Sequence, residues 1–166
     1  TFLFASYGGA VWWTNDPTYY KVAVGTGGDG SSAGSPIYKA NLEAALSDAA
    51  LSSLDSVIIL LPEGEYSANA APYSITKSSL AIIGEGDTST VTIKSPVDIE
   101  LTNGGNVSFQ KVHLTAKTST GRGVVDIKSS KTTVSFSESK ITIEGRGTGD
   151  SGSRGLFRYS VSINCR

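Results

Sequence analysis

The chain has 166 residues, a length typical of one domain that buries a core without disulfide or metal staples. Its 14 Lys and Arg residues nearly balance its 15 Asp and Glu residues, so no broad basic surface for nucleic acid or an anionic membrane is expected. The longest apolar run, residues 57–61, is too short to span a bilayer. Neither nucleic acid nor a membrane is therefore expected as a partner.

Residues 1–35 are predicted to form N-terminal strands followed by a Gly-rich loop. Residues 19–24 alternate apolar and polar side chains, as a strand does, and residues 25–34 have no side chains that could build a core. The loop holds one Gly-Gly-Asp-Gly segment, at positions 27–30. Repeat-type calcium turns need several copies in register, so a connector without a cofactor is predicted, with calcium as the alternative.

Residues 36–54 are predicted to form the one helix. Ser35 suits the N-cap, and Pro36 suits the first helical position, where its missing N–H costs nothing. Apolar residues recur at helical spacing on a single stripe: Leu42, Ala45, Leu46 and Ala49. A helix of this kind is expected to cap an apolar surface.

Residues 55–166 return repeatedly to an apolar triplet. The triplets begin at Val57, Leu80, Val107, Val134 and Val161; the first step between them is the shortest, and the other three steps are equal. A second set, at residues 97–99 and 124–127, is compatible with the same period, and a third, shorter set begins at residues 91, 112 and 141, which gives three strands per repeat. This pattern predicts an all-β fold, a parallel β-helix of about five coils with a period of about 27 residues.

The whole chain, 1–166, is predicted to be a single domain. It contains no Met, which favours a processed protein or a piece of a longer chain. No capping helix is predicted after residue 163, so the last coil is expected to expose its edge. Other protein subunits are the expected cover, in a homo-oligomer or a larger assembly.

Several segments resemble the pectin-lyase-like superfamily of right-handed parallel β-helices. These are the Gly/Asp/Ser loop after a strand at 20–36, the Ala-rich stretch at 41–50, the Pro-x-Gly-x-Tyr sequence at 62–66, and an apolar triplet followed by Gly-x-Gly at 80–86. The resemblance covers residues 20–144 and implies a right-handed coil. It leaves the activity open, because the superfamily includes lyases, hydrolases, phage tailspikes, adhesins and non-catalytic modules.

Acidic residues on two strand-like segments are the candidate catalytic group. If Ile99 aligns with Ile127, then Asp98 lies beside Asp126, one strand spacing away, and Glu100 faces Lys128. Paired carboxylates of this kind can serve as acid and base or bind calcium. A solvated strand face with one ion pair is the preferred interpretation, so no catalytic or metal site is assigned.

Adjacent tryptophans, Trp12 and Trp13, point to opposite sides if they lie in a strand, which leaves one available for contact. A subunit interface is favoured there over stacking on a sugar. His113 lies between two apolar residues and is predicted to be a surface residue. The single cysteine, Cys165, cannot form an internal disulfide.

These observations favour a non-catalytic structural or attachment module of the tail-fibre, capsid-decoration or surface-adhesin type. The expected location is extracellular, on a cell surface or on a virion, with a surface glycan as a further candidate partner. A polysaccharide lyase or glycoside hydrolase is the alternative, with Asp98, Glu100 and Asp126 as its acids.

Overall fold

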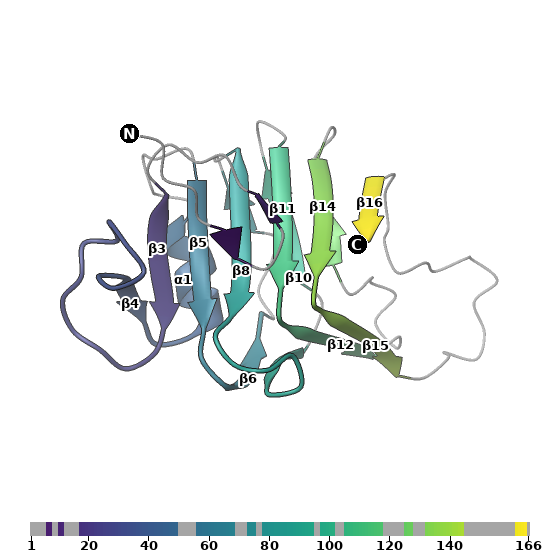
Figure 1. Ribbon diagram of the computed structural model, residues 1–166, viewed down its shortest axis with the longest axis horizontal. Helices are drawn as coiled ribbons and strands as arrows, with labels where there is room; N and C mark the ends of the chain where they lie inside the picture. Colours follow the sequence, from purple (N-terminus) through teal and green to yellow (C-terminus); the bar gives the residue numbers. More distant parts are fainter. Residues whose placement is uncertain are drawn as a thin grey trace.

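The computed structural model describes residues 6–7, 10–11, 17–49, 56–68, 73–75, 78–94, 97–101, 105–117, 125–127, 132–144 and 162–165. Within these ranges the chain is almost entirely β structure, with one short helix (Figure 1). The strands form three parallel sheets and one antiparallel pair, β1 (Ser6–Tyr7) with β2 (Ala10–Val11).

The largest sheet has seven strands, in the order β16-β14-β11-β8-β5-β3-β4. Their bounds are β3 Thr18–Val22, β4 Ile37–Lys39, β5 Ser56–Leu61, β8 Ser79–Gly84, β11 Gly105–Gln110, β14 Thr132–Ser137 and β16 Ser162–Cys165.

The two smaller sheets contain four and three strands, in the orders β15-β12-β9-β6 and β13-β10-β7. The four-stranded sheet consists of β6 Gly64–Ser67, β9 Val91–Lys94, β12 His113–Lys117 and β15 Lys140–Glu144. The three-stranded sheet consists of β7 Tyr73–Ile75, β10 Val97–Leu101 and β13 Val125–Ile127.

Parallel register aligns the apolar triplets of successive strands in the large sheet. Val57 pairs with Leu80, which pairs with Val107, which pairs with Val134, as the sequence predicted. The next partner is Ile163. The expected partner, Val161, lies outside the described residues.

These aligned residues build one apolar core that takes side chains from all three sheets and the helix. At its end near β14, the rings of Phe109 and Phe136 stack with centroids 5.3 Å apart and an angle of 12° between their planes. Burial of such files of Val, Ile, Leu and Phe is the main stabilising contribution.

The expected right-handed parallel β-helix of about five coils is wrong. Five three-strand coils place about five strands in every sheet, whereas these sheets contain seven, four and three, and the described residues do not form a closed solenoid. The equal step holds from Leu80 through Val107 to Val134, but the next step, to Ile163, is longer, and β3 and β4 enter the sheet with other spacings. The described part of the protein is a mostly parallel β fold with one short helix.

The helix also begins later than the predicted range 36–54. It runs as α1 over Leu42–Ala49, because Ile37–Lys39 pairs with β3 as a strand instead. Asn41 is the N-cap: its side-chain Oδ1 accepts a hydrogen bond from the N–H of Ala44 at 2.8 Å. The apolar stripe was predicted correctly, since Leu42, Ala45, Leu46 and Ala49 are all buried.

Helix α1 lies against the first strands of every parallel sheet. It contacts β3 and β4 of the large sheet, β6 of the four-stranded sheet and β7 of the three-stranded sheet. The helix therefore covers one end of the core. No helix in the described part of the chain is long and apolar enough to cross a membrane.

Candidate functional site

Among the described residues, the end of the molecule away from α1 consists of sheet edges. β13, β15 and β16 are the last strands of their respective sheets, and the large and four-stranded sheets finish on the same side in Figure 1. An edge strand carries a row of backbone N–H and C=O groups that can pair with another strand. This end, defined by β13, β15 and β16, is called the edge face below.

The direction of the free backbone groups is clear for β15. Lys140 donates its N–H to the carbonyl of Val112, at 3.0 Å, on the β12 side. In a strand the N–H and C=O of one residue point the same way, and successive residues alternate. Ile141 therefore directs both of its backbone groups away from β12, to the edge where no described strand pairs with β15, called the open edge below.

Polar contacts cross the four-stranded sheet from β6, at the α1 end, to the edge strand β15. Lys94 and Glu65 form an ion pair of 2.6 Å, and their side chains are 51% and 67% exposed. An exposed pair of this kind contributes little stability. On the neighbouring strands, His113 Nε2 and Thr142 Oγ1 lie 2.8 Å apart.

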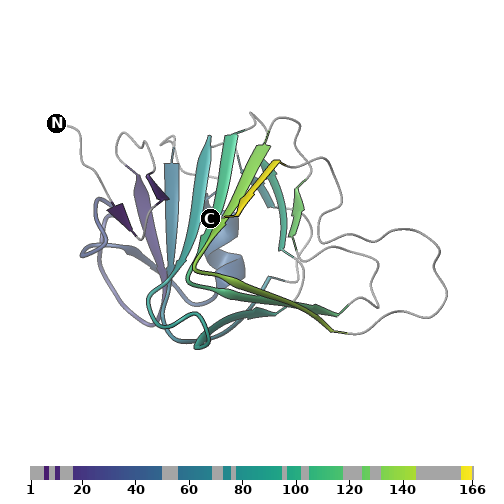
Figure 2. The ribbon, with the colours of Figure 1, turned by 45° about the vertical axis from the view of Figure 1, so that its right-hand side comes forward.

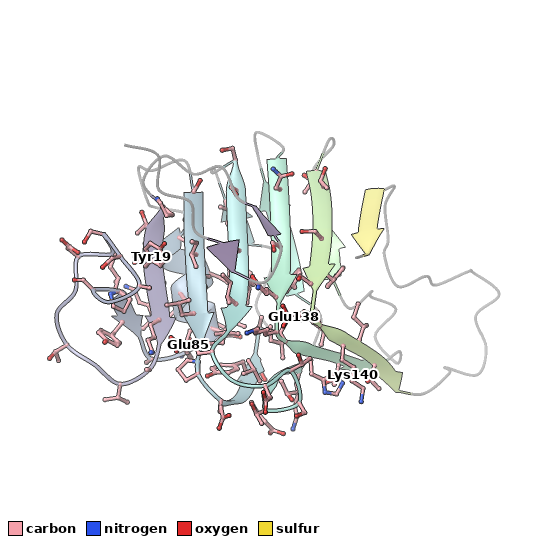
Figure 3. All side chains as sticks on the ribbon, in the orientation of Figure 1. Tyr19, Glu85, Glu138 and Lys140 are labelled. Atoms are coloured by element: carbon pink, nitrogen blue, oxygen red, sulfur yellow. The ribbon has the colours of Figure 1, made fainter. Side chains whose placement is uncertain are left out.

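The imidazole of His113 has a perturbed basicity. Partial burial lowers the pKa of His113 below its ordinary value of 6.5, and the ammonium of Lys140 on the next strand lowers that pKa further. Figure 3 shows Lys140 on β15, beyond the turn that carries Glu138. The neutral form of His113 is thus favoured at neutral pH, and its role as a hydrogen-bond partner of Thr142 fits that form.

Turns between the large and four-stranded sheets are tied to one another. Lys111 and Glu138 each turn the chain in one left-handed residue, with φ of 52° and 48°. The longer turn after β8 reaches across them, since Thr88 donates to the carbonyl of Glu138, and Glu85 in that turn pairs with Lys21 at 2.8 Å. Figure 3 shows Glu85 and Glu138 along this border. These contacts have a structural role in holding the two sheets at a fixed angle.

The outer face of the large sheet is apolar near β3 and polar near β14. Tyr19, Ile58, Leu60, Ala81 and Ile83 form a second buried cluster there. In Figure 1, β1 and β2 are drawn in front of β5 and β8, and in the turned view of Figure 2 they appear over β3, so they lie on the side of the sheet opposite α1. The cluster is already buried within one chain, so it is no docking surface.

The structure places the backbones of two residues of the predicted acidic group, Asp98 and Asp126, on neighbouring strands. Ile99 pairs with Ile127 and Asp98 with Asp126, on β10 and β13. Glu100 pairs with Ser74 of β7 on the other side. Asp98 and Asp126 therefore occupy neighbouring strands at one register position, as predicted, while Lys128 lies outside the described residues.

The predicted aromatic contact, Trp12 and Trp13, also lies outside the described residues. Among the residues that are described, no group of three or more His, Cys, Asp or Glu could hold a metal ion. Cys165 ends β16, the outermost strand of the large sheet.

Sequence reasoning missed the contact between His113 and Thr142 and the ion pair between Lys94 and Glu65. The available signal was the strand register, because the step between paired positions is the same for β12 with β15 as for β6 with β9. Side chains two positions out of register then meet diagonally, as these pairs do. No protein-family model, curated protein or solved structure matches this chain.

Proposed function

We propose that this chain is a non-catalytic structural or attachment module, extracellular or virion-associated, that assembles with other chains. The observation that carries the proposal is the asymmetry of the core. Helix α1 lies against the first strands of all three parallel sheets, whereas β13, β15 and β16 are edge strands at the other end. A second chain that adds strands to the edge face satisfies these backbone groups and extends the core.

The polar contacts across the four-stranded sheet suit attachment rather than catalysis. Its groups are an exposed ion pair and a neutral histidine bonded to a threonine. Such groups offer hydrogen bonds to a partner or a surface glycan. A general base needs a ring nitrogen placed against a substrate proton, and His113 Nε2 instead lies 2.8 Å from Thr142 Oγ1.

Assembly is tested by light scattering after size-exclusion chromatography, over protein concentrations from roughly 1 μM to 1 mM. We expect the wild type to be larger than one chain. Ile141→Pro removes the N–H that faces the open edge and adds a ring there, so it should release monomers. Ile141→Ala is the matched control, because it shortens the same side chain and keeps the N–H.

Both variants must keep the wild-type circular dichroism spectrum for this comparison to count. A wild type that stays monomeric at every concentration overturns the assembly proposal. Equal loss of assembly in Ile141→Ala and Ile141→Pro shows instead that the side chain, and not the open backbone, makes the contact.

A polysaccharide lyase or glycoside hydrolase is the second candidate. The pairing of Asp98 with Asp126 favours it, because acid and base pairs in such enzymes come from neighbouring carboxylates. If the chain is an enzyme, it depolymerises an acidic polysaccharide, and Asp126→Asn lowers that rate at least about 100-fold. Lys94→Gln, on another sheet, is the control. A panel of polyuronates followed by viscosity and reducing-end release checks this, and no release by the wild type rejects the enzyme.

A further inference from the structure

The charges of strand β15 are self-complementary when two copies of the strand run antiparallel. The strand runs Lys140-Ile141-Thr142-Ile143-Glu144, with a cation at one end, an anion at the other and a β-branched residue at each position between them. When two such strands run antiparallel and are centred on Thr142, Lys140 of each lies opposite Glu144 of the other. Parallel pairing in register would place like charges side by side.

The backbone N–H and C=O groups that this antiparallel pairing requires face the open edge of β15. Lys140 bonds to β12 through its N–H, so the backbone groups of Thr142 and Glu144 also face β12, while those of Ile141 and Ile143 face the open edge. In the antiparallel arrangement Ile141 lies opposite Ile143 of the second copy. Each of these two pairs exchanges both of its hydrogen bonds, about four in all.

We propose that two copies of this chain associate through β15, which pairs antiparallel with β15 of the second copy on a two-fold axis at Thr142. The pairing joins two four-stranded sheets into one continuous sheet. This inference rests on the proposed assembly function and names the partner and the contact.

The same register gives each position a suitable counterpart. Lys140 is exposed, and Glu144 of the second copy occupies the register position opposite it. Two identical pairs of opposite charge therefore flank the axis, with Thr142 facing Thr142 between them. Ile141, which is partly buried against the core, continues its apolar layer into the second copy.

The position of α1 favours a closed pair over an open stack. A head-to-tail stack would need β15 of one copy to reach β6, the opposite edge of the sheet in the next copy. α1 contacts β6 and lies at that end. A two-fold contact uses the same strand from both copies, so it closes after two chains and does not propagate into a filament.

Charge reversal tests the pairing. Lys140→Glu and Glu144→Lys each turn both ion pairs into like-charge contacts, and we expect each to raise the dimer dissociation constant roughly tenfold or more in sedimentation equilibrium. The double variant Lys140→Glu/Glu144→Lys restores opposite charges and should return to the wild-type constant. Lys111→Glu, at a turn outside β15, is the control for net charge.

A crosslink tests the two-fold axis directly. In a Cys165→Ser background, Thr142→Cys places two introduced thiols at a non-hydrogen-bonded pair, with Cα atoms about 4.5 Å apart, within disulfide reach. A mild oxidant should give a covalent dimer. Thr115→Cys is the matched control: it is the registered neighbour on β12, so its two copies lie about 14 Å apart and should not crosslink.

The outcomes separate the two proposals. If the wild type assembles but the reversed charges have no effect and Thr142→Cys does not crosslink, the β15 pairing is wrong and the assembly function stands on another edge. If the wild type is monomeric throughout, both are wrong. Rescue by the double variant, together with selective crosslinking at position 142, establishes the contact.

Discussion

Gly105 begins β11 in a conformation that other residues rarely adopt. Its φ is 131°, and a Cβ at this position would lie 2.0 Å from the carbonyl oxygen of Ser78. The next residue, Asn106, donates its N–H to that same carbonyl at 2.9 Å. Glycine thus allows the close approach that fixes where β11 joins β8.

We therefore expect Gly105→Ala to lower the free energy of unfolding by about 2 kcal/mol or more, through backbone strain and the clash with Ser78. Gly34→Ala is the control, since the nearest atom to its Cβ, Ser32 Oγ, lies 3.9 Å away. Urea denaturation measures both. Similar midpoints for the two variants would contradict the argument.

Tyr20 carries a phenol that is buried against the helix. Burial raises its pKa to about 12, and the neighbouring carboxylate of Asp48 raises the pKa in the same direction. The phenol ionises more readily in the unfolded chain, with an ordinary pKa of 10.0. Its contribution to stability is therefore complete below pH 10 and is lost between pH 10 and about 12.

Tyr20→Phe removes this titrating group. We expect the free energy of unfolding of the wild type to fall from pH 9.5 to 11.5 by up to about 2 kcal/mol more than that of Tyr20→Phe. Urea titrations at each pH give the two curves. Parallel curves would show that the phenol has the same pKa in both states.

At the scale of elements, α1 depends on its N-terminal cap and on one ion pair. Lys39 of β4 and Asp48 of α1 lie 2.9 Å apart, with about a third or less of each side chain exposed. The eight helical residues that the structure describes are too few to be stable alone, so their order comes from packing and from Asn41 at the start of the helix.

Loss of the cap should be measurable in the stability of the whole domain. Asn41→Ala leaves the N–H of Ala44 without its side-chain acceptor and should cost about 1 kcal/mol. Asn41→Asp keeps an acceptor and should stay within about 0.5 kcal/mol of the wild type. Chemical denaturation of the three proteins checks this, and equal losses in both variants would exclude the cap as the cause.

The sequence predicted local features better than it predicted their assembly. The alignment of Leu80, Val107 and Val134 followed from side-chain alternation and a fixed spacing, both of which are readable from one chain. The replacement of Val161 by Ile163 was not readable, because the length of a connection does not fix its register. Ser35 and Pro36 look like a helix start, yet pairing of Ile37–Lys39 with β3 overrides that preference.

In the candidate sites, too, local features were predicted and features that depend on the overall arrangement of strands were not. The alignment of Asp98 with Asp126 was predicted, since it depends on one pair of strands. The meeting of His113 with Thr142 depends on which strands are neighbours and on a diagonal contact between them, so it needed the structure. The number of strands in each sheet likewise depends on turns of unequal length, such as the long turn after β8 and the two-residue turn at Lys111 and Val112.

At the scale of the molecule, the two ends of the core differ. One end is covered by α1 and the other presents β13, β15 and β16. Burial follows the same gradient across the large sheet. Every residue of β5 and of β8 is buried, because both faces of these strands are covered, whereas β14 alternates buried and half-buried positions.

This gradient predicts the order in which backbone amides escape protection in deuterated water. Amides of β5 and β8 sit between two apolar layers and should exchange only when the whole domain opens, while those of β14 and β15 should exchange through smaller, more frequent fluctuations. Exchange followed by mass spectrometry on peptic fragments would report the difference. The domain would then open first at β14 and β15 and last at β5 and β8. A partner bound to β15 would slow exchange at the amides that open first.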